Sequence, residues 1–183
     1  SDKVEILNSS NPTDANDYPF FVDEGLVLHL PLDGKPNDYS KFKRKSSVKY
    51  AKATEGPSGA SKKAYSFDGE KSYIEVSYSG VVENAARSVS GWILPAPSNN
   101  GTIISWGKTG NIFSIGVESG TIHLASDGGT LSGTSDLLDG EWHQFLITLP
   151  QDGNLDAIKV YIDGNEETTT STGNTNTPIN TGK

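Results

Sequence analysis

Apolar residues recur at alternate positions in about ten short segments, and turn residues separate these segments. The pattern is clear in WHQFLITL, residues 142–149, where His143, Phe145, Ile147 and Leu149 share one set of alternating positions. Successive side chains of a β-strand point to opposite faces, so each segment predicts a strand with one buried face. The predicted strands cover residues 26–32, 64–69, 72–77, 88–94, 101–106, 111–118, 120–125, 142–149, 157–164 and 166–172.

Turn signals between these segments are uniform. Asp-Gly occurs six times, and this dipeptide supplies the positive φ angles that tight hairpins need. We expect hairpin turns at Asp163-Gly164 and at Ser119-Gly120. Residues 81–88 are the only helix that the pattern predicts. Many short strands at regular spacing are typical of a β-sandwich or jelly roll.

Composition narrows the class of protein further. The 183 residues are enough for one domain with a sizeable core, which we expect over residues 23–183. Residues 1–22 are polar, and either an extended arm docked through Tyr18, Phe20 and Phe21 or a disordered linker fits them. There is no cysteine, so disulfides and thiolate chemistry are excluded. No run is long enough for a membrane span.

The ionisable residues do not form a recognisable catalytic motif. The three histidines lie inside apolar segments, and no Gly-x-Ser-x-Gly motif surrounds any serine. A glycosidase needs two facing carboxylates, and the pairs Asp68/Glu70 and Asp139/Glu141 both lie on Asp-Gly turns. We therefore expect turn chemistry from these acids and a core role for His143. The sequence therefore predicts that the chain is not an enzyme.

Several segments in order resemble the laminin G-like (pentraxin-like, concanavalin A-like) jelly-roll domains. They are GLVLHLPLDG (25–34), AYSFDGEKSYIEV (64–76), RSVSGWILP (87–95), GTIISWG (101–107), FSIGVESGTIHL (113–124), DGEWHQFLITL (139–149) and IKVYIDG (158–164). The resemblance implies an all-β, two-sheet antiparallel jelly-roll sandwich. It departs from the family in the C-terminal stretch TGNTNTPINTGK, which lacks an apolar last strand. The arm, a partner chain or a truncation would account for the gap.

The resemblance also implies a structural calcium ion, because such an ion is common in the family. The loop LDGKPND offers Asp33, Asn37 and Asp38, and oxygen ligands of this kind suit Ca²⁺. Plain turn chemistry is the alternative explanation for these three residues.

A basic segment, residues 41–52, carries six of the 15 basic residues and no acid. The formal net charge is −8 for the whole chain and therefore −14 for the remainder without this segment. Lys43, Arg44 and Lys45 are the candidate ligand-binding residues of this segment. They suit an anionic partner, such as a sulfated or uronic polysaccharide or an acidic protein. A solvated loop is the alternative, and the acidic remainder disfavours nucleic acid.

Aromatic residues give the candidates for stacking on sugar rings. Trp106 is predicted to be the most exposed tryptophan because it ends a strand beside Gly107. Tyr73 alternates with Ile74 and Val76 and is predicted to face solvent. Aromatic side chains within apolar strands are more often part of a core, and that alternative stays open.

Three functions remain to be weighed. The favoured one is a noncatalytic carbohydrate-binding or adhesion module on a bacterial or viral surface protein, located outside the cell or on a virion. The alternative is a structural or decoration protein that contacts neighbouring subunits there. A glycan-cleaving enzyme is the third and least favoured. The predicted partners are therefore a glycan or a protein subunit, and not nucleic acid.

Overall fold

The computed structural model describes residues 25–97, 100–126, 128–173 and 175–182. The predicted arm, residues 1–22, lies outside the described residues. The chain divides into two compact units, Ser1–Tyr78 and Ser79–Lys183, which are described separately below. The single domain expected over residues 23–183 stays a prediction.

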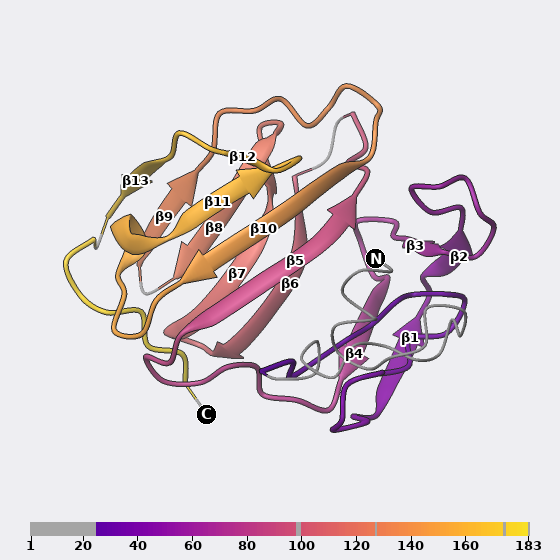
Figure 1. Cartoon of the computed structure of the whole chain (residues 1–183), viewed down its shortest axis with the longest axis horizontal. Coiled ribbons are helices and arrows are strands. Elements are labelled where there is room, and N and C mark those ends of the chain that lie inside the picture. The colour runs from indigo at the N-terminus through magenta and orange to yellow at the C-terminus, as the bar shows by residue number, and fades with distance from the viewer. Residues whose placement is uncertain (1–24, 98–99, 127, 174, 183) are drawn as a thin grey trace, which may run out of the picture. The chain divides into compact units, whose positions relative to one another are not determined.

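The first unit contains two small antiparallel pairs of strands (Figure 1). Strand β1 (Ser46–Lys49) pairs with β4 (Tyr73–Val76), and β2 (Lys52–Thr54) pairs with β3 (Ala64–Ser66). Strand β1 and the start of β2 lie within the basic segment, which had been interpreted as a docking patch or a solvated loop. The three-residue β3 and the four-residue β4 fall inside the strands predicted there.

The strand predicted at residues 26–32 is wrong. No strand forms there, His29 is exposed, and Leu32 has a φ of 56°. The backbone of His29 bonds locally instead, because its N–H donates to Asp38 Oδ1 (3.0 Å) and its carbonyl accepts from Tyr39 N–H (2.8 Å). A side chain thus satisfies a backbone group that a sheet partner would otherwise satisfy.

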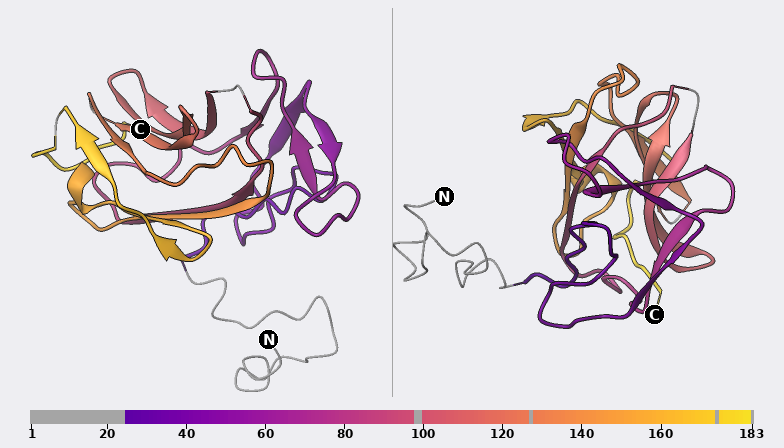
Figure 2. Two further views of the ribbon diagram at one scale, coloured as in Figure 1. Left: turned by 90° about the horizontal axis from the view of Figure 1, so that it is seen from above. Right: turned by 90° about the vertical axis from the view of Figure 1, so that its right-hand side faces the viewer.

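The second unit is a sandwich of two antiparallel sheets, as expected. One sheet has four strands in the order β12-β11-β10-β5, and the other has five in the order β13-β9-β8-β7-β6. Figure 2 shows the two sheets as separate layers. The strands are β5 (Arg87–Ile93), β6 (Gly101–Lys108), β7 (Asn111–Glu118), β8 (Thr121–Ser126), β9 (Gly129–Ser132), β10 (His143–Leu149), β11 (Lys159–Ile162), β12 (Asn165–Glu166) and β13 (Thr170–Thr172).

The core of this unit follows the predicted alternation. On β10, the buried positions are 143, 145, 147 and 149, and the other positions face outward. Phe145, Ile147 and Leu149 pack with inward residues of the opposite sheet such as Phe113 and Ile115. Burying one such side chain contributes about 1.5–3 kcal/mol, so this shared layer is the main source of the unit's stability.

Both predicted hairpin turns are confirmed. Ser119 and Gly120 have φ angles of 51° and 84°, and Asp163 and Gly164 have φ angles of 50° and 80°. Two consecutive positive φ angles define the type I′ turn, whose twist matches that of the flanking strands. These turns set the register of β7 with β8 and of β11 with β12.

The helix predicted over residues 81–88 is wrong, because Arg87 uses the carbonyl groups that a helix would need. Its guanidinium donates to the carbonyls of Val81 (3.0 Å), Glu83 (2.7 Å) and Ala85 (3.0 Å). Arg87 is buried and begins β5. It also donates to Thr181 Oγ1 at 2.9 Å.

The C-terminal segment forms no full strand among the described residues. It contributes one isolated antiparallel bridge between Glu83 and Thr181. Ile179 and Thr181 are nevertheless buried, and Ile179 packs in the hydrophobic core. A sequence poor in apolar residues therefore still closes part of the sandwich.

Candidate functional site

The outer face of the four-stranded sheet is the most distinctive surface of the second unit. We call it the sheet face. It is formed by the outward residues of three neighbouring strands, and its members are Ser88, Ser90 and Trp92 of β5, Gln144, Leu146 and Thr148 of β10, and Lys159 and Tyr161 of β11. The inward residues of these strands fill the core, so the sheet face stands on a rigid layer.

Strand register arranges this face in rows. Trp92 lies opposite Gln144 in one row, and Ser90, Leu146 and Tyr161 lie side by side in the next. The Cα atoms of Trp92 and Tyr161, two strands and two residues apart, are about 12 Å from each other by ideal sheet geometry. The face thus offers two aromatic rings with polar groups around them.

Trp92 is unusually exposed for its size. Its side chain is on the outward side of β5 and the residue is 53% exposed, while Leu146 is 36% exposed. Large aromatic residues are usually highly buried, so the half-exposed indole makes this face a candidate binding surface.

Polar groups surround Tyr161 at the other end of the face. Lys159 Nζ lies 3.1 Å from Glu166 Oε1, and this ion pair raises the pKa of Lys159. The carboxylate of Glu166 also accepts a long hydrogen bond of 3.5 Å from the Tyr161 hydroxyl. The charges of Lys159 and Glu166 cancel, so the face is aromatic and polar with little net charge.

The prediction that Trp106 is the most exposed tryptophan is wrong. Its Nε1 donates to the Val81 carbonyl at 2.9 Å, and its ring packs 4.8 Å from the Phe113 ring. A Cβ added at Gly80 would lie 2.1 Å from the indole, so the ring is closely covered. Strand β6 also continues two residues past Trp106, to Lys108, and the chain at residues 80–81 packs over the indole.

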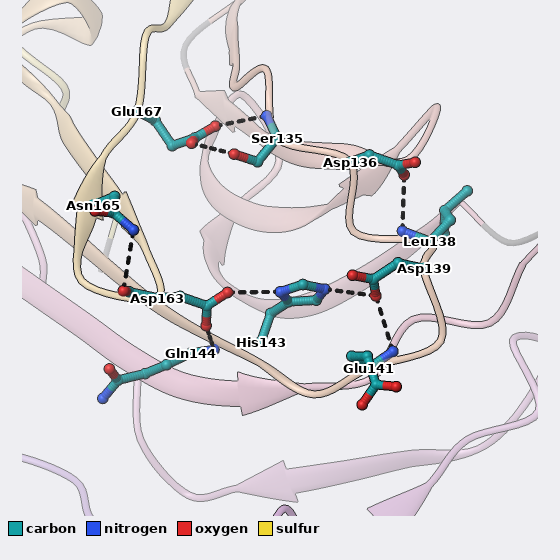
Figure 3. A network of polar contacts seen from close by, with 10 residues as sticks. All are labelled: Ser135, Asp136, Leu138, Asp139, Glu141, His143, Gln144, Asp163, Asn165 and Glu167. Carbon is teal, nitrogen blue, oxygen red and sulfur yellow. Dashed lines mark hydrogen bonds and ion pairs between the residues drawn. The ribbon is translucent and has the colours of Figure 1, made fainter.

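His143, which had been predicted to be a core residue, is buried and holds two loops together (Figure 3). Its Nδ1 lies 2.8 Å from Asp163 Oδ2 and its Nε2 lies 3.0 Å from Asp139 Oδ1. Two carboxylates need two N–H donors, which only the protonated imidazole supplies. The hydrogen bond to Asp163 therefore raises the pKa of His143, against the opposing effect of burial.

We call His143, Asp139 and Asp163 the clamp, and this clamp also supports the sheet face. Asp163 Oδ1 accepts the backbone N–H of Gln144 at 2.8 Å, and Gln144 is the cross-strand partner of Trp92. A third carboxylate, that of Glu167, accepts the backbone N–H groups of Thr134 and Ser135, both at 2.9 Å, and so anchors the loop that leads toward Asp139.

The aspartates of the two carboxylate pairs considered for glycoside hydrolysis bond within turns, as expected. Asp139 Oδ1 accepts the N–H of Glu141 (2.9 Å), and this bond, with that from His143, lowers the pKa of Asp139. Asp68 Oδ1 accepts from the N–H of Glu70 (3.0 Å) and from the hydroxyl of Ser72 (2.7 Å), and the latter bond lowers its pKa most. Both acids are bonded to the loop in which they lie.

Of the three residues predicted to bind calcium, Asp38 accepts hydrogen bonds from its own unit. Asp38 is buried, and each of its carboxylate oxygens accepts two hydrogen bonds, from His29 and Ser40 N–H and from Ser40 Oγ and Arg44 N–H. Burial raises the pKa of Asp38, but these bonds outweigh it and lower the pKa to about 2. Asp33 and Asn37 are exposed. No cluster of three metal-binding side chains occurs within the described ranges, and a calcium site stays a prediction.

Of the three basic candidates, Arg44 is fixed inside the first unit. Its guanidinium lies 3.9 Å from Asp38, donates to the Val27 carbonyl, and packs over the rings of Phe42 (4.2 Å) and Tyr78 (3.8 Å). Lys43 and Lys45 are exposed. Tyr73 is 49% exposed, as predicted.

Sequence reasoning missed Trp92, although the signal was present. In SVSGWIL, Trp92 shares alternate positions with Ser88 and Ser90, while Val89 and Ile93 occupy the opposite set and pack against the core. A tryptophan in phase with serines predicts exposure by the same rule that placed His143 in the core.

Comparison with known proteins agrees with this architecture. Residues 68–183 match a laminin G family model described as the concanavalin A-like lectin/glucanases superfamily. No curated protein and no solved structure gives a significant match. In the described part of the chain, no helix has the length and apolar character that crossing a membrane requires. On the family match and on its two antiparallel sheets, the chain belongs to the concanavalin A-like lectin/glucanase superfamily.

Proposed function

We propose that this protein is a noncatalytic carbohydrate-binding module, and that it binds a neutral glycan on the sheet face. The observation that carries the proposal is the exposed indole of Trp92 beside the amide of Gln144. The apolar face of a pyranose ring stacks on such an indole, and the amide hydrogen-bonds the neighbouring hydroxyl groups. Tyr161, about 12 Å away by sheet geometry, provides a second ring for an extended glycan chain.

The noncatalytic assignment rests on the carboxylates. Asp139 and Asp163 are bound to His143, and Asp68 is bound within its own turn. A glycosidase would need an acid and a second carboxylate free to face the glycosidic bond. We place the module at an extracellular surface, on a cell or a virion, on the strength of its laminin G-like family.

Titration calorimetry against a panel of neutral oligosaccharides tests the proposal. We expect Trp92→Ala to weaken binding at least about 30-fold, the cost of truncating a central aromatic contact. The matched control is Phe67→Ala, because Phe67 is equally exposed (50%) but belongs to the first unit. An unchanged affinity in Trp92→Ala, or no binding by the unaltered protein across the panel, would contradict the proposal.

A reducing-sugar assay on the same panel tests the noncatalytic assignment. Turnover that Glu141→Gln abolishes would show a glycan-cleaving enzyme. No release of reducing ends from a glycan that binds is the expected result.

One observation favours a second candidate, a structural subunit that makes protein contacts. Trp92, Leu94 and Leu146 are exposed large hydrophobic residues of the second unit, and two of them belong to the sheet face. Light scattering distinguishes the two candidates. A defined oligomer that Trp92→Ala dissociates, without any glycan binding, would support the structural role.

A further inference from the structure

The exposed side of the β1–β4 pair is a second surface with a definite pattern, and it belongs to the first unit. Lys49 lies opposite Tyr73, Ser47 lies opposite Glu75, and Ser77 N–H donates to the Lys45 carbonyl at 2.8 Å. Alternation places these side chains on one side and Val48, Ile74 and Val76 on the other. We call the exposed side the basic face: Lys45, Ser47, Lys49, Lys71, Tyr73, Glu75 and Ser77.

The cations of this face are spaced along the strands. Lys45 and Lys49, four residues apart on an extended chain, are separated by about 13 Å. Lys71 precedes Tyr73 by two positions, and its ammonium lies 5.5 Å from the centre of the Tyr50 ring. Tyr50 is 71% exposed and Tyr73 is 49% exposed. The face therefore alternates positive charges with open aromatic rings.

A pocket of about 600 Å³ adjoins the Lys45 end. Lys43, Lys45, Tyr39 and Asn37 contribute to its lining. The Lys43 ammonium lies 5.5 Å from the centre of the Tyr39 ring and donates to the Tyr39 carbonyl at 3.2 Å, so it is held at the pocket. The pocket continues the pairing of cations with aromatic rings beyond the end of β1.

The charge of residues 25–78, the described part of the first unit, supports the same ligand. Residues 25–78 contain ten basic and six acidic residues, a net charge of +4 in a chain whose total is −8. Such a local excess attracts anions to this region even though the protein as a whole is acidic.

We propose that the basic face and the adjoining pocket bind an anionic polysaccharide, one that carries sulfate or uronate groups. Tyr73 and Tyr50 stack on the sugar rings, while Lys45, Lys49 and Lys71 pair with the anionic substituents. The wide spacing of the lysines suits a polymer with isolated charges. Double-stranded DNA carries a charge about every 1.7 Å and would place phosphates against Glu75.

Affinity electrophoresis of the full chain tests this proposal, with heparin as the sulfated probe, polygalacturonate as the uronic probe, dextran as the neutral probe and a DNA duplex. We expect retardation by heparin, by polygalacturonate or by both, and the two arms identify the anionic group. The variant Lys45→Ala/Lys49→Ala/Lys71→Ala should bind the effective probe at least about 10-fold more weakly. The control Lys35→Ala/Lys52→Ala/Lys63→Ala removes the same charge from exposed positions outside the face and should change affinity less than about 2-fold.

A further variant guards against a trivial loss of folding. Glu75→Gln removes the one anion of the basic face and should strengthen binding about 2- to 5-fold, an effect that damage to the fold would not produce. Equal losses in the two triple variants, tighter binding to the DNA duplex than to both polysaccharides, or no binding to either at low salt would overturn the proposal. None of these outcomes bears on Trp92 or on neutral glycans.

Discussion

The sheet face and the basic face are built in the same way but differ in what they present to solvent. Each is the outward side of antiparallel strands whose alternate residues face inward. On the sheet face, the single cation Lys159 is paired with Glu166, and the ring of Trp92 dominates. On the basic face, three lysines alternate with tyrosine. The comparison shows that a common strand geometry sets the spacing, while the residues at exposed positions decide whether a face is neutral or positively charged.

The two faces also rest on different foundations. Fifteen buried hydrophobic residues form the core beneath the sheet face, and all belong to the second unit. Among the described residues of the first unit, Ala64 is the only buried hydrophobic residue. The buried polar residues Asp38 and Ser40, with Arg44, take the place of an apolar core there. The basic face should therefore be the easier one to disrupt.

The largest expected effect comes from Arg44→Ala. It removes a guanidinium packed on two aromatic rings and leaves the buried Asp38 without its ion-pair partner. We expect a local destabilisation of about 3 kcal/mol, near the lower limit for breaking a buried pair, since backbone N–H groups still solvate Asp38.

Amide hydrogen exchange measures this destabilisation directly. The amides of His29, Ser40 and Arg44, which donate to Asp38, should exchange faster in the variant, while the amides of β7 and β10 keep their protection. Lys41→Ala, a neighbouring exposed cation, is the control. Uniform loss of protection in both units would show that the foundations of the two faces are not separate.

A crossed binding experiment separates the ligands of the two faces. Trp92→Ala should lower neutral-glycan affinity at least about 30-fold and leave polyanion affinity within about 2-fold. The triple lysine variant should show the reverse pattern, with at least about a 10-fold loss for the polyanion. If one variant weakened both ligands equally, the two faces would form a single binding site.

A smaller effect is expected for Trp106→Phe, which distinguishes a packed tryptophan from an exposed one. The substitution keeps an aromatic ring against Phe113 but removes the hydrogen bond to the Val81 carbonyl. The Val81 carbonyl keeps its hydrogen bonds from Arg87 and Thr181, so the loss of this one bond should cost about 0.5–1.5 kcal/mol in urea unfolding. Neutral-glycan affinity at a temperature where the variant is folded should not change. A loss of affinity matching that of Trp92→Ala would show that Trp106 belongs to the glycan-binding surface.

Much of the second unit was predictable because its strands alternate strictly. The inward residues of β10 and both type I′ turns follow from period-two patterning and from the conformational freedom of glycine. These are local rules, and they hold where the packing of a sheet agrees with them.

The failures arose where distant groups satisfy the backbone. The helix expected over residues 81–88 gives way to Arg87, which takes three carbonyls and reaches Thr181, 94 residues away. The strand expected at residues 26–32 does not form, and the His29 N–H donates to the Asp38 carboxylate instead of to a neighbouring strand. The local pattern predicts exposure of Trp106 because the residues that pack over its ring, Gly80 and Val81, come from another part of the chain. Such pairings are tertiary facts that no local pattern contains.

The smallest expected effect is a change with pH in the stability of the second unit, and it should affect the sheet face more than the basic face. The bond to Asp163 raises the pKa of His143, so the clamp contributes fully below the unfolded value near 6.5 and is lost as the pH rises through the higher folded value. Hydrogen bonds lower the pKa values of Asp139 and Asp163, so their contribution is lost only in acid, below the ordinary value of 3.8. The clamp is therefore strongest between about pH 4 and pH 6.5.

Thermal unfolding from pH 6 to pH 9 measures the effect. The melting temperature of the second unit should fall by about 2–4 °C over this range, and His143→Gln should melt lower at pH 6 but lose this dependence. Because Asp163 also accepts the N–H of Gln144, neutral-glycan binding should weaken in parallel, while polyanion binding by the basic face, which contains no histidine, should respond far less. An equal response of polyanion binding to pH would mean that the clamp controls more than the row of Trp92 and Gln144.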